Sequence, residues 1–165
     1  MGLIGIKSGI ITVLGLIAYG LIAPMVGLQQ SLWDGSAYVV LALGIYSGHY
    51  YYKAANKGVM TYQQGLKLGL IVISFTGLVN GLIVYLHAKR LDPLFIEKLN
   101  ESVQKALQEK GFSEAIIEQV GQMMQHMTPA FLLLGTLVST VLLGFALTLV
   151  IALFSSTPKQ ANRSS

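Results

Sequence analysis

Four long stretches of the chain contain no Asp, Glu, Lys or Arg. They cover 26 residues between Lys7 and Asp34, 18 between Asp34 and Lys53, 19 from position 68 to 86 and 25 from position 130 to 154. A helix needs about 20 apolar residues to cross the roughly 30 Å hydrocarbon layer of a bilayer. Because lipid offers no partner to backbone amides, each stretch should be helical. We therefore predict an all-α fold, an integral membrane four-helix bundle.

The composition agrees with burial in lipid. Only 11% of the residues are charged and 53% are hydrophobic, whereas soluble domains carry about 25% charged residues. The chain has no cysteine, which excludes disulfides and thiolate chemistry. We expect one membrane domain with spans at about 8–30, 35–53, 67–88 and 130–154, and a disordered tail at 156–165. The first span is longer than the core of a secretory signal, and "YGLIAPM" is a poor cleavage site, so we expect it to be retained.

The charges indicate an orientation. With the N-terminus in the cytoplasm, four crossings return the C-terminus to the same side. The cytoplasmic pieces then carry six basic residues and no acid, while all seven acids lie outside, where the net charge is −2. This agrees with the positive-inside rule, although Lys89 and Arg90 at the outer end of the third span oppose it. We expect a multi-pass protein of the cytoplasmic (inner) membrane with both termini cytoplasmic.

The segment 92–127 predicts an extracytoplasmic amphipathic helical hairpin between the third and fourth spans. Asp92 and Pro93 suit a helix start, and Gly111 suits a left-handed C-terminal cap. Ser113 and Thr128 suit the starts of the next two helices. The apolar side chains recur at helical spacing on each half. Such a hairpin can pack on itself, lie on the outer leaflet or cover a partner.

Three short motifs give the chain a resemblance to a known family. They are "DPLFIEK" at 92–98, "EKGFSEAIIEQ" at 109–119 and "MTYQQGLKLGL" at 60–70. With these motifs the chain resembles the bacterial domain-of-unknown-function family 4199, small membrane proteins with four predicted spans. The resemblance covers nearly the whole chain in layout. It implies that layout and carries over no catalytic residue.

The stretch "HYYYK" predicts an interfacial belt at the cytoplasmic end of the second span. Tyr and Trp are enriched where hydrocarbon meets headgroups, and a lysine can reach past them into water. We expect His49 to lie in this belt, with a proton-handling or ligand-binding role as the alternative. The predicted anchors are Trp33, Tyr50, Tyr51, Tyr52 and Lys53.

Small residues spaced four apart predict where the spans pack against each other. Glycines at this spacing allow helix backbones to approach closely, within one chain or between copies. Asn80 is the most polar residue deep in a span, and we expect it to form a hydrogen bond across a helix interface. The predicted packing residues are Gly77, Asn80, Gly81, Gly44 and Gly48.

No motif for a cofactor, a nucleophile or nucleic acid is present, so we expect no catalytic residue, no cofactor and no bound nucleic acid. A site of His87 and His126, or a Cu(I) site in "MMQHM", is geometrically feasible, but we expect these side chains to serve packing and predict no metal. Our leading hypothesis is a non-enzymatic accessory, assembly or scaffold subunit. The alternative is a small oligomeric transporter or channel component. Expected partners are membrane lipids, a second copy, or another membrane protein.

Overall fold

The computed structural model describes residues 1–26 and 35–157, and every regular element in this part of the chain is helical. Four of these elements are long helices, two shorter helices form a hairpin, and two single turns extend the ends of long helices. In chain order they are α1 (Gly2–Ile22), the 3-10 turn η1 (Ala23–Val26), α2 (Ser36–Ala55), α3 (Tyr62–Leu86), the π-helical turn η2 (His87–Leu91), α4 (Phe95–Glu109), α5 (Glu114–Gln125) and α6 (Pro129–Ser155).

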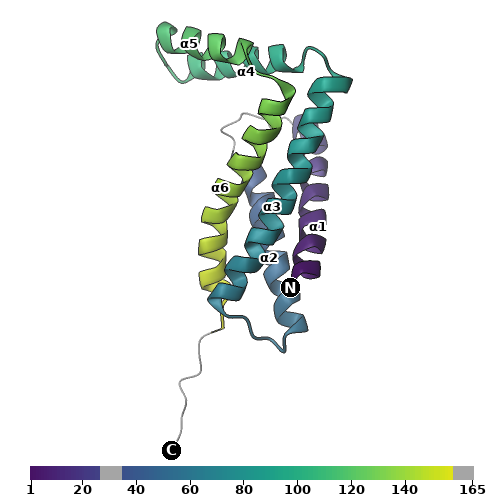
Figure 1. Ribbon diagram of the computed structural model, residues 1–165. Helices are drawn as coiled ribbons and strands as arrows, with labels where there is room; N and C mark the ends of the chain where they lie inside the picture. Colours follow the sequence, from purple (N-terminus) through teal and green to yellow (C-terminus); the bar gives the residue numbers. More distant parts are fainter. Residues whose placement is uncertain (27–34, 158–165) are drawn as a thin grey trace, which may run out of the picture.

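The four long helices α1, α2, α3 and α6 pack side by side (Figure 1). α1 and α3 run in one direction along the bundle, and α2 and α6 run in the opposite direction. The most extensive contact is between α3 and α6, and α1 packs on both α2 and α3. A small apolar core lies between α2, α3 and α6. It consists of Leu41, Ile45, Val72 and Ile73, with Leu147 and Ile151 against it.

Three helices are long and apolar enough to cross a membrane: α1, α3 continued by η2 (Tyr62–Leu91), and α6. Many of their large apolar side chains point outward, for example Leu14, Leu142 and Leu153. Soluble proteins rarely expose such continuous apolar surface, so the three helices indicate a membrane protein. α2 is not among the three, because its 20 residues include His49, Lys53 and several tyrosines.

Two helices, α1 and α3, do not begin where the charges led us to expect. α1 starts at Gly2 rather than near residue 8 and ends at Ile22, and the last part of that expected span lies outside the described residues. α3 starts at Tyr62, because Thr61 and Gln64 form a reciprocal capping box. Lys7 and Lys67 therefore lie within helices: a lysine marks the depth at which a side chain meets water, not the end of a helix.

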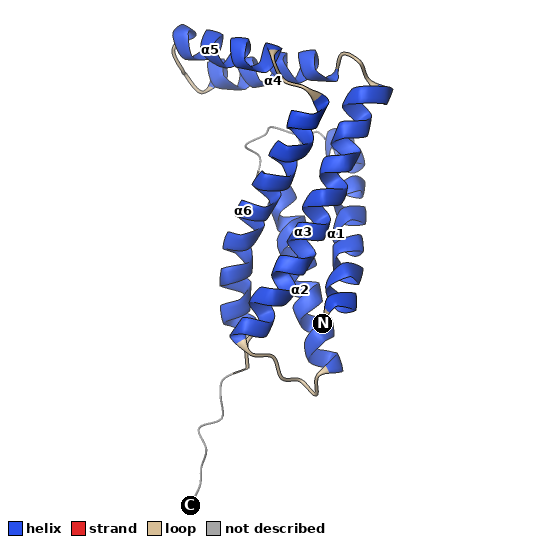
Figure 2. Ribbon diagram, in the orientation of Figure 1, coloured by secondary structure: helices blue, strands red, loops and turns tan. Residues whose placement is uncertain are grey.

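The hairpin of α4 and α5 lies across one end of the bundle (Figures 1 and 2). Gly111, with φ of +76°, ends α4 as expected. The amide of Gly111 donates to the carbonyl of Gln108 (3.0 Å), and the amide of Phe112 donates to that of Leu107 (3.1 Å). This pair of bonds is the Schellman motif. α4 and α5 pack chiefly on each other, and Gly121 gives Gln104 room at the contact.

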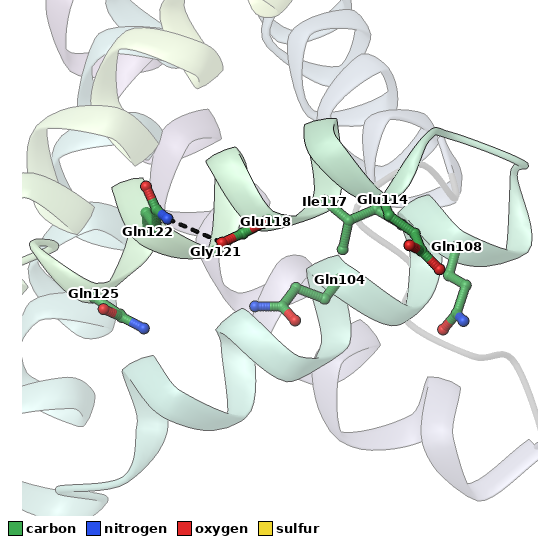
Figure 3. Close-up of a pocket in the computed structure, with 8 residues that line it drawn as sticks. All are labelled: Gln104, Gln108, Glu114, Ile117, Glu118, Gly121, Gln122 and Gln125. Carbon is green, nitrogen blue, oxygen red and sulfur yellow. Dashed lines mark hydrogen bonds between the residues drawn. The ribbon is translucent and has the colours of Figure 1, made fainter.

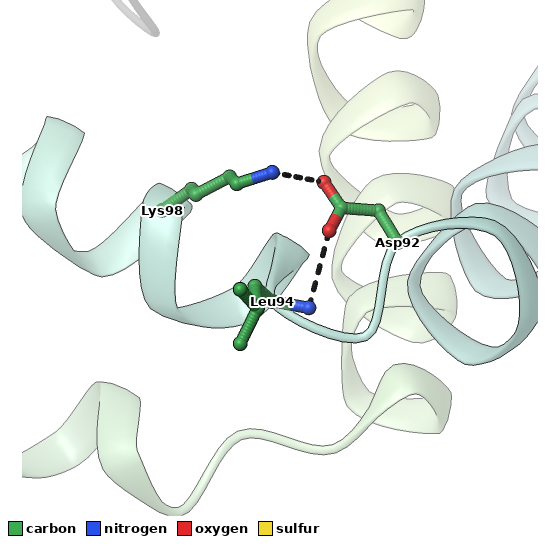
Figure 4. A network of polar contacts seen from close by, with 3 residues as sticks. All are labelled: Asp92, Leu94 and Lys98. Atoms are coloured by element: carbon green, nitrogen blue, oxygen red, sulfur yellow. Dashed lines mark hydrogen bonds and ion pairs between the residues drawn. The ribbon is translucent and has the colours of Figure 1, made fainter.

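Our prediction for the start of α4 is wrong in register. Asp92 and Pro93 do not open the helix, which begins at Phe95. Instead the Asp92 carboxylate accepts a hydrogen bond from the Leu94 amide (3.1 Å) and forms an ion pair with Lys98 (2.8 Å), as Figure 4 shows. Asp92 thus closes a turn before the helix. At the start of α6 Thr128 accepts from the amide of Phe131 (3.2 Å), and the helix begins at Pro129, as predicted.

This turn should respond to acid. The hydrogen bond from Lys98 is the main cause that lowers the pKa of the Asp92 carboxyl, helped by the charge of Lys98 and by the Leu94 amide. Because the pKa is lower in the folded state, the turn is stabilised fully above the unfolded pKa of about 4 and loses this contribution as pH falls through the lower, folded pKa. We expect hydrogen exchange of the Leu94 amide to accelerate, relative to its unfolded reference, at this acid pH. In Asp92→Asn the acid-dependent step should vanish, and its persistence would contradict the assignment.

Candidate functional site

His49 is buried at the end of the bundle where α3 begins. Its side chain is 0% exposed, whereas Tyr46 and Tyr50 on the same helix are mostly exposed. Placing His49 in the interfacial belt was therefore wrong. Tyr46, His49, Tyr50 and Lys53 lie on neighbouring positions of the helix surface. Of these four, His49 is the one whose side chain points toward α3 and α6.

Both ring nitrogens of His49 are hydrogen-bonded. Nε2 lies 3.0 Å from the carbonyl oxygen of Gly65 on α3. A carbonyl can only accept, so Nε2 carries a proton. Nδ1 lies 2.6 Å from the hydroxyl of Ser155 on α6, and that hydroxyl also lies 2.7 Å from the carbonyl of Ile151. One imidazole therefore connects three helices.

Close packing surrounds this imidazole. A Cβ added at Gly65 would lie 3.1 Å from the Cβ of Ala152 and 3.4 Å from both His49 and the methyl group of Met60. Met60, in the loop between α2 and α3, is fully buried. A glycine at position 65 therefore lets α3 approach α6 closely beside the ring.

The chain just after α6 is hydrogen-bonded to the loop between α2 and α3, close to His49. The Thr157 amide donates to the carbonyl of Met60 (2.8 Å), and the Met60 amide donates to the Thr157 hydroxyl (3.1 Å). Disorder was expected from residue 156, but Ser156 and Thr157 are described and Thr157 is held by these bonds. The rest of that segment, 158–165, lies outside the described residues.

Glycines in the bundle face hydroxyl side chains on neighbouring helices. Gly44 lies against Thr12, Gly48 against Ser8, and Gly69 against Thr148. In the described part of the chain the hydroxyls of Ser8, Thr148 and Thr76 are buried without a hydrogen-bond partner. Sequence reasoning picked out the glycines but missed the hydroxyls of Ser8 and Thr148, although Ser8 and Thr12 share one face of α1 at four-residue spacing.

The remaining predicted packing residues lie along α3. At Gly77 a Cβ would lie 3.2 Å from Leu137 and Thr140, and at Gly81 it would lie 2.9 Å from the carbonyl oxygen of Leu133. Both glycines therefore sit where α3 meets α6. Asn80, between them in sequence, is half-buried.

A polar groove runs along one face of the hairpin between α4 and α5 (Figure 3). Apart from Ile117 and Gly121, its lining consists of side-chain amides and carboxylates: Gln104, Gln108, Glu114, Glu118, Gln122 and Gln125. Gln122 donates to the carboxylate of Glu118 (3.3 Å). The groove can offer hydrogen bonds and negative charge, but it holds no nucleophile paired with a base.

Comparison with protein families decides the relationship that the sequence suggested. The model of the family DUF4199, proteins of unknown function, matches residues 5–157. The chain belongs to DUF4199. The match takes in the hairpin, His49 and Ser155, and it assigns none of them a function. Neither the curated proteins nor the solved structures contain a match to the chain.

The predicted interfacial anchors of this DUF4199 member gather near the end of α2. Tyr50 and Tyr51 are exposed, and their rings meet edge to face with centroids 5.7 Å apart. Tyr52 and Lys53 are half-buried. Trp33 lies outside the described residues.

The other two histidines of the DUF4199 chain lie at the hairpin end of the bundle. The His87 ring packs edge-on against Phe95, with centroids 4.9 Å apart, and His126 is exposed at the end of α5. Within residues 1–26 and 35–157, no three His, Asp or Glu side chains converge in a geometry that could hold a metal ion.

Proposed function

We propose that this DUF4199 protein is a non-enzymatic accessory, assembly or scaffold subunit of a membrane complex, with the α4–α5 hairpin as its contact surface. The observation that carries the proposal is the position of the hairpin. It lies across one end of the bundle and packs chiefly on itself. A structural element that contributes little to the bundle core is available to bind something else.

The proposal places the four-helix bundle in the cytoplasmic membrane, with α2 as the fourth crossing. It is supported by the direction of the chain: α1 and α3 run the same way, and α2 carries the chain back between them. The distribution of charge supports both termini in the cytoplasm and the hairpin outside, because six of the seven acids lie between Asp92 and Glu118.

The burial of the His49 side chain supports a non-enzymatic role. His49 is fully buried and both of its nitrogens bind protein groups. A general base must reach a proton of its substrate to within about 3 Å, and no substrate can approach this ring. His49 thus serves to hold helices together.

The groove on the hairpin suggests what the contact surface recognises. Its amides can bind a peptide backbone, and Glu114 and Glu118, one turn apart, favour a basic segment. We infer that a basic extracytoplasmic segment of another membrane protein, or of a second copy, is held here.

The test compares two charge-reversal pairs in the full-length protein. Glu114→Lys with Glu118→Lys alters the groove, whereas Glu101→Lys with Glu109→Lys makes the same change in charge outside its lining. Each protein is cross-linked in intact membranes, extracted in mild detergent and analysed by quantitative mass spectrometry. We expect a partner present in amounts comparable to the bait to be lost from the groove pair and kept by the control pair. Equal recovery with both pairs, or no such partner with the unaltered protein, would overturn the proposal.

The alternative, a small oligomeric transporter or channel component, is favoured by one observation. The hydroxyls of Thr76 on α3 and Thr148 on α6 are buried without a hydrogen-bond partner among the described residues, and Asn80 follows one turn after Thr76. These groups would line a path only if several copies assembled, because four helices are few for an aqueous channel. Solute flux in proteoliposomes that is lost in Asn80→Leu would favour this alternative over the scaffold.

A further inference from the structure

The hairpin has an apolar face opposite its polar groove. At 100° per residue, the groove residues of α5 lie on one side of the helix, and Ile116, Val120 and Met123 lie on the other. On α4 the equivalent stripe is Phe95, Leu99, Val103 and Ala106. Met123 is 66% exposed and Ile116 is 43% exposed, so the described chain leaves this face partly uncovered.

The apolar face begins against the bundle. Phe95, the first residue of the α4 stripe, packs on His87 in η2 at the end of α3. The side of α4 that carries Phe95 and Leu99 is therefore turned toward the ends of the long helices. The groove, on the opposite side, faces away from them.

The connections to the bundle keep the hairpin close to it. Three residues separate η2 from α4, and three separate α5 from α6. Exposed apolar side chains lie beside both connections: Leu91 and Leu94 between α3 and α4, and Phe131 and Leu134 in the first two turns of α6. The apolar face is thus continuous with the outward surface of α3 and α6, two helices able to cross a membrane.

We propose that the apolar face of α4–α5 rests on the membrane, with its side chains in the boundary between headgroups and acyl chains. Amphipathic helices at such a boundary bury their apolar face about 5–10 Å deep. The hairpin then lies flat on the bilayer, and its polar groove points into the aqueous phase. This inference rests on the membrane placement given above and adds the orientation of the contact surface.

Because the chain contains no cysteine, a single introduced cysteine can be labelled specifically. Full-length Met123→Cys and Gln122→Cys proteins carry a spin label on adjacent residues of the apolar and polar faces, and Leu142→Cys carries it on an outward position of α6. The proteins are reconstituted in phosphatidylcholine vesicles, and the accessibility of each label to oxygen, which enters lipid, is compared with that to a water-soluble nickel chelate. Gel filtration in detergent before reconstitution verifies that each protein is folded.

We expect the ratio of oxygen to nickel accessibility to be several-fold higher at Met123 than at Gln122, with Leu142 higher still. Equal ratios at Met123 and Gln122, with Leu142 in lipid, would overturn the inference and leave the membrane placement intact. Nickel access at Leu142 would overturn the membrane placement itself. Protection of Met123 from both reagents, relieved when the protein is diluted in lipid, would show that a second copy covers the face and would also overturn the inference.

Discussion

Replacing His49 by alanine is expected to lower the free energy of unfolding by about 2–5 kcal/mol, the range found when large buried side chains are reduced to alanine. The imidazole is fully buried, so its removal leaves a cavity between α2, α3 and α6. It also removes the two hydrogen bonds to Gly65 and Ser155. Thermal or denaturant unfolding in detergent micelles measures the loss.

Tyr46→Ala is the matched control for this prediction. Tyr46 is a larger side chain one turn earlier on α2, and it is mostly exposed. Surface substitutions usually change stability by no more than about 0.5 kcal/mol. Equal destabilisation by the two substitutions would show that His49 is not a centre of packing. Ser155→Ala adds a second check, because its effect and that of His49→Ala should be less than additive if the two side chains act through one contact.

Replacing Gly69 by alanine is expected to destabilise the protein by about 1–3 kcal/mol, as overpacking of a close contact does. A Cβ at this position would lie 2.7 Å from the hydroxyl oxygen of Thr148 and closer still to its methyl group. α3 and α6 would have to separate to accept it. Unfolding in detergent again provides the measurement.

Thr148→Ala should restore part of this loss. The substitution removes the methyl group that a Cβ at Gly69 would meet, and the hydroxyl it removes has no hydrogen-bond partner among the described residues. The recovery is partial because the two Cβ atoms would still lie 3.0 Å apart. We expect a coupling of about 0.5–3 kcal/mol in the double-mutant cycle.

Gly135→Ala is the control for the glycine prediction. Gly135 lies on α6 with nothing within 4 Å of an added Cβ. Alanine in a helix interior is favoured over glycine by about 0.5–1 kcal/mol, so this variant should be slightly more stable than the original protein. Destabilisation of similar size at positions 69 and 135 would mean that close approach of α3 and α6 is not what glycine provides.

Much of the helical layout could be predicted from the sequence, because lipid imposes a simple rule on charge. The uncharged stretches correspond to long helices, and the chemistry of Gly111 and of Thr128 with Pro129 correctly placed two helix ends. The pair Thr61 and Gln64 indicates the start of α3, but we placed that start at Lys67 because we used charge alone to set the boundary. Asp92 was misplaced because an Asp-Pro pair suits a turn as well as a helix start.

The cluster around His49 could not be predicted in the same way. Its partners, Gly65 and Ser155, lie 16 and 106 residues away, and no local pattern records which edge of α2 faces α3 and α6. The tyrosines that follow His49 indicated an exposed position, and Tyr50 and Tyr51 are indeed exposed, whereas His49 is buried. Glycine spacing indicated that helices approach closely, but it did not indicate which hydroxyl lies opposite each glycine.

The bond between Thr157 and Met60 joins positions 97 residues apart, with a consequence for how the protein matures. During synthesis α1, α2 and α3 emerge well before the last turn of α6, since chains grow from the N-terminus at about 5–20 residues per second. Until Ser155 and Thr157 have been synthesised, Nδ1 of His49 and the amide of Met60 lack the partners that they have in the complete structure. The nascent bundle therefore stays incomplete at this end until the last turn of α6 and the two residues after it have been added.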